Sequence, residues 1–233
     1  MKRLTSNLSL IILLTNAMWA FGGFGIYGNI DQFSVTPETT TSGEISVVPE
    51  SLDGGAGFGV FLYLDIIPVV DLQADFEFVG NLYKFNSVVG NISSGMNFPW
   101  GRISQYYTVR KELIGASVPF LAKVQIYAGA GFNSHKSIPI VSVDFIESVF
   151  VNDDMNLTEA ASQDFSDSEI TDALEDFIRD NQLSSSGLHL QVGAQAKLLA
   201  FNVFTNLRYT IAEDVVPGKK GFPSIWIGGA IGI

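Results

Sequence analysis

The sequence predicts an all-β fold, namely an antiparallel up-and-down barrel of eight strands that crosses a membrane. Apolar and polar residues alternate with period two along much of the chain, which places them on opposite faces of strands. The connections between these runs are alternately short and long along the chain. Charged residues make up only 16% of the 233 residues, whereas a soluble domain usually carries about 25%.

The N-terminal segment, residues 1–20, has the three-part layout of a secretory signal peptide. Two basic residues precede an apolar run at 8–14, and small residues follow at Ala17 and Ala20. The apolar run is shorter than the roughly 18 residues that a membrane-spanning helix needs. We therefore expect cleavage after Ala17 or Ala20 and a mature domain over 21–233. A buried N-terminal helix is the alternative.

Eight runs carry the strand pattern, and the clearest is DLQADFEFVGNLY. In this run Leu72, Ala74 and Phe76 fall on one face, while Asp75 and Glu77 fall on the other. Only a strand separates these two sets. The fourth run is the weakest, because TVRKELIG does not alternate cleanly. The predicted strands are 23–34, 55–66, 70–85, 103–116, 120–133, 187–199, 201–213 and 223–232.

The connections between the predicted strands are sorted by length. Short links follow the second, fourth and sixth strands, and two of them turn at a proline, Pro68 or Pro119. Long polar stretches follow the odd-numbered strands, at 35–54, 86–102, 134–186 and 214–222. A barrel with both ends in the periplasm has this arrangement, because short turns face the periplasm and longer loops face the exterior.

The polar faces of the runs distinguish a membrane barrel from a soluble one, since both kinds alternate. These faces hold mainly Gln, Asn, Tyr and Gly with isolated charges, whereas a solvated surface is about a quarter or more charged. We therefore predict apolar side chains toward lipid and polar side chains inside. A soluble periplasmic barrel that binds a small apolar ligand is the alternative.

The interior of an eight-stranded barrel is just wide enough for side chains, so charges inside it must be paired. We predict that Asp75 and Glu77 pair across the lumen with Arg208, Lys197 or Lys123. The alternative is that these charges lie near a barrel end and are hydrated. His189 lies on the polar face of its strand, so we expect its imidazole to be inside the barrel and hydrogen-bonded. The predicted interior polar network is Asp75, Glu77, Lys123, His189, Lys197 and Arg208.

The acidity of the chain belongs to one insertion, residues 144–184. This segment holds twelve acids and one base, which accounts for the whole net charge of −11. Within it, SEITDALEDFIRDNQL shows helical spacing after a capping box at Ser166 and Glu169. We expect this helix to cover the barrel mouth or residues 138–151; a site for an extracellular partner or divalent cations is the alternative. Its apolar stripe is Ile170, Ala173, Leu174, Phe177 and Ile178.

Catalytic, metal and nucleic-acid chemistry find little support in the sequence, and we expect no cofactor. The chain has no cysteine, and neither histidine has a partner at ligand spacing on a helix. The stretch 153–159, DDMNLTE, lacks the glycine and the glutamate of a calcium-binding EF-hand. His135 beside Ser134 is the candidate for a lipid-modifying barrel enzyme, but a lone rim histidine is mostly a solvated loop residue. A nucleic-acid partner would need a basic face.

Glycines recur in the predicted strands, beginning with GFGIYG at 23–28. The spacing fits a dinucleotide-binding loop, but such a loop follows a strand and opens a helix, which this segment does not. Similar runs stand at 54–59, 128–131 and 228–232. Glycines that face a narrow lumen leave room for large inward side chains. The predicted inward aromatic residues are Tyr27, Phe61, Tyr63, Tyr127 and Trp226.

The last four predicted strands carry a family likeness. FLAKVQIYAGAGF (120–132), GLHLQVGAQAKLLAFNVFTNLRYTIAED (187–214) and IWIGGAIGI (225–233) resemble the eight-stranded outer-membrane barrels of Gram-negative bacteria, broadly OmpA- or OmpX-like. The resemblance implies contact with outer-membrane lipids, insertion by the barrel assembly machinery, and a structural, adhesion or surface-interaction role without enzymatic activity. Two features depart from the family: Ile233 replaces the usual terminal aromatic residue, and the third outer loop is long and partly helical.

Overall fold

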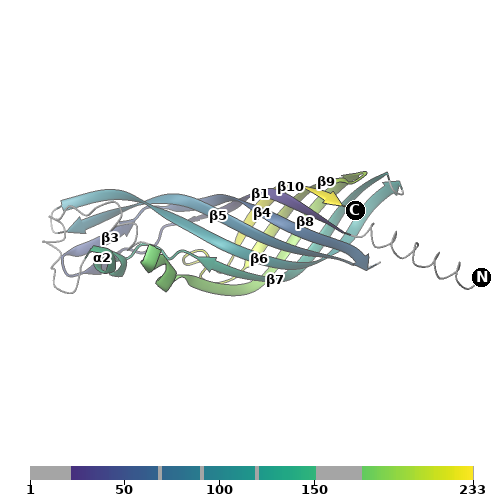
Figure 1. The fold of residues 1–233 in the computed structure, drawn as a ribbon. Helices are drawn as coiled ribbons and strands as arrows, with labels where there is room; N and C mark the ends of the chain where they lie inside the picture. Colours follow the sequence, from purple (N-terminus) through teal and green to yellow (C-terminus); the bar gives the residue numbers. More distant parts are fainter. Residues whose placement is uncertain (1–21, 68–69, 90–91, 119–120, 151–174, 233) are drawn as a thin grey trace, which may run out of the picture.

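The computed structural model describes residues 22–67, 70–89, 92–118, 121–150 and 175–232. The strands in these ranges belong to one sheet, and most of them follow one another around a closed, tilted barrel (Figure 1). The barrel strands are β1 (Gly22–Val35), β4 (Leu52–Ile67), β5 (Val70–Val89), β6 (Ile92–Val118), β7 (Ala122–Ser137), β8 (Leu183–Leu198), β9 (Phe201–Ile211) and β10 (Phe222–Gly232).

The pairing of the strands closes the ring. Each barrel strand runs antiparallel to the next one along the chain, and the last strand, β10, pairs with the first, β1. The links β4–β5, β6–β7 and β8–β9 span only a few residues. The structure therefore confirms the predicted antiparallel up-and-down barrel and the short links after alternate strands.

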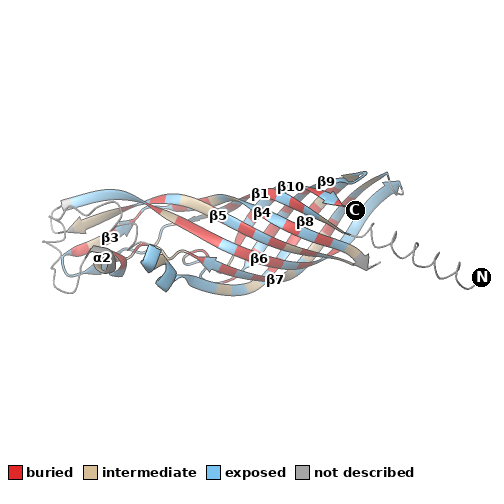
Figure 2. Cartoon of the chain, viewed as in Figure 1, coloured by how far each residue is buried: buried red, intermediate tan, exposed pale blue. Residues whose placement is uncertain are grey.

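Side chains on the outer surface of the barrel are apolar, and those inside are mainly polar or aromatic. Ile26 is 64% exposed, whereas its neighbour Tyr27 is 3% exposed. Figure 2 shows the same alternation of buried and exposed positions along the barrel strands. Every barrel strand contributes large exposed apolar residues, for example Ile26, Leu62, Phe76, Tyr107, Ile126, Leu190, Leu207 and Ile227.

An exposed apolar surface of this extent is unfavourable in water, where soluble monomers rarely expose more than a few hundred Å² of contiguous apolar patch. It matches the outward-facing apolar band of a transmembrane barrel. A soluble ligand-binding barrel needs the reverse arrangement, with apolar side chains inside. The burial pattern therefore contradicts the soluble alternative.

The hairpin of β5 and β6 continues well beyond the ring, which corrects the predicted loop at 86–102. Pairing of β5 with β4 reaches Gly80, but its pairing with β6 continues to the contact of Val89 with Ile92. The far end of the hairpin mixes polar residues such as Ser87 and Ser93 with apolar ones such as Val89 and Ile92. Periodicity did not reveal these strand positions, because no lipid belt imposes an apolar face on that part of the hairpin.

The predicted loop at 35–54 contains a further small hairpin. It comprises β2 (Thr40–Ser42) and β3 (Ile45–Pro49), and β3 pairs with the extended end of β5. The turn between the two strands contains Gly43 at φ +57°. A positive φ is easily adopted by glycine, which lacks a Cβ atom. Strands β2, β3, β5 and β6 thus build a sheet beyond the ring.

Strand β8 and the ladder between β6 and β7 also differ from the prediction. Strand β8 begins at Leu183, because Ser184 and Ser186 pair with the end of β7. The ladder between β6 and β7 shifts register between Glu112 and Ile114. This irregularity explains why the sequence around these residues fails to alternate: the shift moves the following residues to the opposite faces.

Helical structure lies between β7 and β8. The helix α2 (Val143–Phe150) was not predicted, and the Ser142 hydroxyl accepts a hydrogen bond from the Phe145 amide near its start. Residues 175–181 are also helical, within the predicted helix of the acidic insertion. The capping box, the signal peptide at 1–20, the calcium-like stretch at 153–159 and Ile233 lie outside the described residues. In the described part of the chain, no helix has the length and apolar character needed to cross a membrane.

Candidate functional site

The barrel interior contains a cluster of five buried charged side chains, here called the interior charge cluster. The Arg102 guanidinium donates two hydrogen bonds of 2.8 Å to the Asp31 carboxylate and one of 2.6 Å to Glu77. Arg208 donates at 2.6 Å to Asp75 and at 3.5 Å to the other oxygen of Glu77. Glu77 thus bridges the two arginines. Side chains from β1, β5, β6 and β9 meet in this cluster.

Neutral side chains complete the surroundings of the cluster. Tyr27 donates its hydroxyl to Glu77 at 2.9 Å, and Gln73 donates its amide to Asp75 at 2.5 Å. The Arg208 guanidinium lies 3.8 Å from the centre of the Tyr106 ring. Buried charges are tolerated when partners of opposite charge and hydrogen bonds surround them. The cluster satisfies this condition by linking strands from opposite sides of the barrel.

The structure brings together three of the predicted network residues and separates the two lysines from them. Lys123 forms a 3.0 Å ion pair with Glu112 and is 30% exposed. Lys197 is half-buried and lies directly across from Lys123 in the ladder of β7 and β8. Both lysines lie close to the short turns, so they are too far along their strands to reach Asp75. Of the three alternative partners predicted for Asp75 and Glu77, Arg208 therefore pairs with both, and neither lysine does.

The two histidines lie inside the barrel. His189 forms a 2.8 Å hydrogen bond through Nε2 with the Thr108 hydroxyl, and its ring lies 5.1 Å from that of Tyr106. His135 forms a 2.7 Å hydrogen bond through Nδ1 with the Ser104 hydroxyl and is only 2% exposed. The interpretation of His135 as a solvated rim residue is corrected, because β7 continues to Ser137 and turns this side chain inward.

The interior charge cluster includes Asp31 and Arg102, which the sequence analysis missed. The missed signal is a period-two set of polar and aromatic residues on β6, which continues the inward face one residue before the predicted start of that strand. Asp31 belongs to the first predicted strand, but as a single acid after glycine-rich residues it gave no indication of a partner. The inward set on β6 is Arg102, Ser104, Tyr106, Thr108 and Arg110.

Aromatic side chains fill the interior on the side of the cluster toward the short turns. The rings of Tyr27 and Trp226 lie 4.6 Å apart, and those of Phe61 and Phe204 lie 5.1 Å apart. A Cβ atom on Gly59 would overlap the Tyr27 ring. The structure thus confirms that strand glycines leave room for inward aromatic residues. The buried rings of this aromatic layer are Tyr27, Phe61, Tyr63, Tyr127, Phe204 and Trp226, and Ala230 packs with them.

A buried arginine lies beside the aromatic layer. The Arg110 guanidinium lies 4.8 Å from the centre of the Tyr127 ring and within 4 Å of two carboxylates, at 3.6 Å from Asp65 and 3.8 Å from Asp71. The side chains of both acids are partly exposed, at 29% and 15%. This arginine therefore closes the interior at the level where water begins to reach it.

A second apolar core fills the opposite end of the barrel and continues beyond the ring. Trp100 and Phe222 are buried at the barrel mouth, where the ring of Phe33 lies 5.4 Å from that of Trp100. The Arg102 guanidinium lies 5.0 Å from the centre of the Phe222 ring, so this core sits directly on the interior charge cluster. Side chains therefore fill the interior as three successive layers, apolar, charged and aromatic.

Beyond the ring, β2, β3, the ends of β5 and β6, α2 and residues 175–181 form a cap (Figure 1). Its core includes Phe98 of β6 and Phe145 of α2, whose rings are 5.1 Å apart. Phe177 of the predicted apolar stripe lies 4.6 Å from Phe145, and Ile178 is half-buried. The other stripe residues, Ile170, Ala173 and Leu174, lie outside the described residues.

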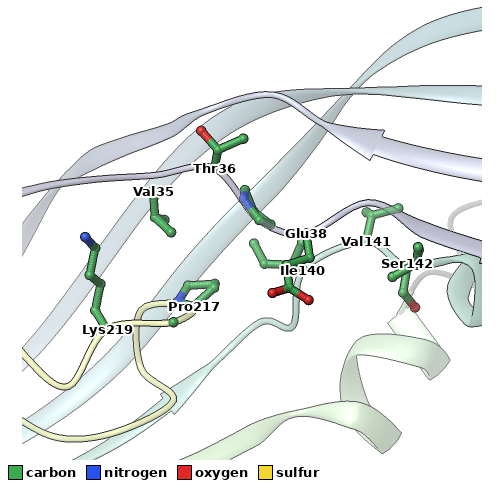
Figure 3. Close-up of a pocket in the computed structure, with 11 residues that line it drawn as sticks. Val35, Thr36, Glu38, Ile140, Val141, Ser142, Pro217 and Lys219 are labelled. Carbon is green, nitrogen blue, oxygen red and sulfur yellow. The ribbon is translucent and has the colours of Figure 1, made fainter.

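A cleft of about 500 Å³ opens beside the cap. Three segments line it: residues 35–40, which lead from β1 into β2, residues 140–142, which precede α2, and residues 217–219 of the β9–β10 loop. Figure 3 shows Val35, Ile140, Val141 and Pro217 among its lining residues. The volume falls in the range of small-molecule binding sites, roughly 300–1,000 Å³.

The fold and the filled polar interior define the chain as a small up-and-down transmembrane β-barrel, the class of bacterial outer membranes. A scan of protein-family models finds no match, and a search of curated proteins finds none at the threshold applied. Solved structures similar to this chain include Ail, the attachment invasion locus protein of Yersinia pestis, with 10% identity, 91% of this chain and 97% of that chain covered, and a TM-score of 0.39.

Two other similar structures are outer-membrane or surface proteins by their descriptions. OprG of Pseudomonas aeruginosa shares 10% identity, with 91% of this chain and 93% of that chain covered and a TM-score of 0.45. Neisserial surface protein A shares 9% identity, with 91% and 97% covered and a TM-score of 0.42. The assignment of the fold rests on the strand pairing and burial of this chain itself.

Proposed function

We propose that this protein is a non-enzymatic β-barrel of the bacterial outer membrane whose cap faces the cell exterior and serves in surface interactions. The observation that carries the proposal is that side chains fill the barrel interior, while a second core extends from the barrel mouth into a cap beyond the ring. Side chains occupy the interior through which a solute would pass, so the barrel acts as an anchor. The cap is then the part of the described chain that is free to meet other molecules.

The position of the short turns supports an exterior cap. Gly23 of β1 pairs with Gly232 of β10 at the end of the barrel opposite the cap (Figure 1). The short turns of the barrel also lie at that end. Outer-membrane barrels place their short turns in the periplasm and their longer connections outside. The same orientation places the cap outside the cell.

The edge of the β5–β6 hairpin supports an interaction role over a purely structural one. Among the described residues, 92–100 of β6 pair with β5 alone, the Gly101 carbonyl accepts a hydrogen bond from the Ile138 amide, and pairing with β7 begins at Arg102. The side chains of residues 93–97 are exposed. A strand with one open edge is able to pair with an extended segment of another protein.

The remaining alternative, a lipid-modifying barrel enzyme, is less well supported. Such an enzyme needs a histidine with a serine or carboxylate at the outer rim. His135 and Ser104 do form a hydrogen bond, but both side chains are buried, with exposed fractions of 2% and 1%. In this position the imidazole packs against Tyr106 and Phe222. The pair is better explained as part of the interior packing.

The orientation is tested by labelling single cysteines on intact cells, because the chain contains no cysteine of its own. Ser94→Cys, at the tip of the cap, is expected to react with a membrane-impermeant maleimide. Ala200→Cys, in the β8–β9 turn, is the matched control and is expected to react only after the outer membrane is permeabilised. Labelling of Ala200→Cys but not Ser94→Cys on intact cells would overturn the proposed orientation, and recovery in the soluble periplasm would overturn the membrane assignment.

A further inference from the structure

The walls of the cleft beside the cap are held in place by hydrogen bonds. The Val141 amide donates to the Tyr83 hydroxyl at 2.9 Å, and the Val143 amide donates to the Thr40 hydroxyl at 2.9 Å. On the third wall, the Lys219 amide donates to the Val216 carbonyl at 3.0 Å, and Gly218 adopts φ +66°. The first two bonds join the segment before α2 to β5 and β2, and the third closes a turn within the β9–β10 loop.

The lining of the cleft combines an apolar floor with opposite charges. Val35, Ile140 and Pro217 supply apolar atoms, while Glu38 and Lys219 supply a carboxylate and an ammonium group. In Figure 3, Pro217 lies between Lys219 on the left and Glu38 on the right. Among the described residues, these two charged groups form no ion pair with each other or with a third residue. Both side chains are exposed and free to bind a ligand.

We propose that this cleft binds a short peptide with free termini and an apolar side chain. The peptide ammonium contacts Glu38, the terminal carboxylate contacts Lys219, and the apolar side chain covers the floor formed by Val35, Ile140 and Pro217. The volume of about 500 Å³ admits such a compact molecule and excludes a folded partner. This inference deepens the proposed surface-interaction role and rests on it, because a cleft on the cell exterior is accessible to peptides outside the cell.

The test uses the purified full-length protein in detergent and the tripeptide Ala-Leu-Ala, with binding measured by titration calorimetry. Three forms of the probe are compared: the free peptide, its N-acetylated form and its C-terminal amide. Because Glu38 and Lys219 are exposed, each charge contact is expected to change affinity by up to about fivefold. N-acetylation is expected to weaken binding to the unchanged protein but not to Glu38→Gln. Amidation is expected to weaken binding to the unchanged protein but not to Lys219→Gln.

Matched controls separate the cleft from the general surface charge. Glu44→Gln changes an exposed acid in the β2–β3 turn, and Lys220→Gln changes the neighbour of Lys219; neither residue lines the cleft. Both control variants are expected to keep full sensitivity to capping. Heat-modifiable gel mobility verifies that every variant is folded. Absence of saturable binding, or capping effects that persist in Glu38→Gln and Lys219→Gln, would overturn the inference.

The outcome of the binding test does not depend on the outcome of the orientation test. Titration of the purified protein measures the cleft regardless of the side of the membrane that the cap faces. Labelling of Ser94→Cys on intact cells measures the orientation regardless of any ligand. Peptide binding together with an inward-facing cap would leave the cleft as a peptide site and remove the proposed exterior role.

Discussion

Arg208 contacts both of the fully buried carboxylates that β5 supplies. Its guanidinium contacts Asp75 at 2.6 Å and Glu77 at 3.5 Å, and all three side chains have no exposed surface. Glu77 retains Arg102 as a second partner, at 2.6 Å. Asp75 has no other cation at this distance among the described residues. The stability of the interior charge cluster therefore depends strongly on Arg208.

Substitution Arg208→Met is expected to lower the free energy of unfolding in detergent by about 3 to 5 kcal/mol, the range for removing one partner of a buried ion pair. Urea titration followed by gel mobility measures this change. Adding Asp75→Asn to the same chain is expected to recover much of the loss, because the orphaned carboxylate is then neutral.

Lys123→Met is the matched control for Arg208→Met. Its partner Glu112 is 42% exposed, so water replaces the lost contact. The expected change is below about 1 kcal/mol, as for other exposed ion pairs. Equal losses from Lys123→Met and Arg208→Met would show that the interior charge cluster has no special importance for stability.

Inward and outward glycines of the barrel are expected to respond differently to substitution. A Cβ atom on Gly59 would overlap the Tyr27 ring, whereas on Gly28 the nearest contact would be the Gly57 carbonyl oxygen at 3.9 Å. Gly59→Ala is therefore expected to destabilise the barrel by about 1 to 3 kcal/mol through overpacking. Gly28→Ala is expected to be nearly neutral. Unfolding titrations compare the two, and equal stability of both variants would contradict the packing argument.

At the scale of elements, the β5–β6 hairpin connects the barrel to the cap. Its inward residues change from charged to apolar along the strand: Glu77 lies in the interior charge cluster, Val79 at the barrel mouth, and Tyr83 and Phe85 in the cap core. The Tyr83 hydroxyl also accepts the hydrogen bond from Val141 that anchors the segment before α2. A single continuous strand thus fixes the cap on the barrel.

The cap is expected to loosen at high pH through Tyr83, which lies in the part of β5 beyond the ring. Burial raises the pKa of Tyr83 to about 12 from its ordinary value of 10.0. A raised pKa stabilises the folded cap below pH 10.0, and this contribution is lost as the pH rises toward about 12, because the unfolded chain releases the proton first. Limited proteolysis across this pH interval should show increasing cleavage of the cap.

Tyr83→Phe provides the control for the pH experiment. This variant lacks the ionising group and also the acceptor for the Val141 amide, so its cap is expected to be cleaved somewhat faster at neutral pH. Its additional sensitivity between pH 10.0 and about 12 should be reduced. An unchanged pH profile in Tyr83→Phe would assign the alkaline loosening to another group.

At the scale of the whole molecule, the barrel carries two separate apolar cores with the interior charge cluster between them. The aromatic layer lies toward the short turns, and the second core runs from the barrel mouth into the cap. Both cores contain large rings in mutual contact, such as Tyr27 with Trp226 and Phe98 with Phe145. Because the interior is filled, the barrel holds the cap at the membrane and leaves no open passage through the described interior.

The purified protein is expected to form no stable ion-conducting channel in planar lipid bilayers. Ion passage would have to cross the aromatic layer, the interior charge cluster and the apolar mouth, all of which are occupied by buried side chains. An open barrel of known conductance, reconstituted in the same way, serves as the positive control. Steady single-channel currents of reproducible size would contradict a closed interior.

The sequence by itself determined the architecture of the barrel. Strict alternation predicted the strand segments, the sorting of short and long links predicted their up-and-down order, and the glycine-rich runs predicted inward rings such as Tyr27 and Trp226. These features are local, because side-chain direction along a strand depends only on position. The polar faces also placed Asp75, Glu77 and Arg208 inside correctly, although alternation alone did not show which charges would meet.

Only the tertiary structure decided the partners and the cap. Strand tilt and register bring Arg102 and Arg208 to Glu77 and leave Lys123 beside Glu112, and no local pattern encodes these distances across the lumen. The cap was missed because its strands are not subject to the lipid belt that makes alternation visible. It forms through contacts between distant segments, and the same contacts create the cleft beside it.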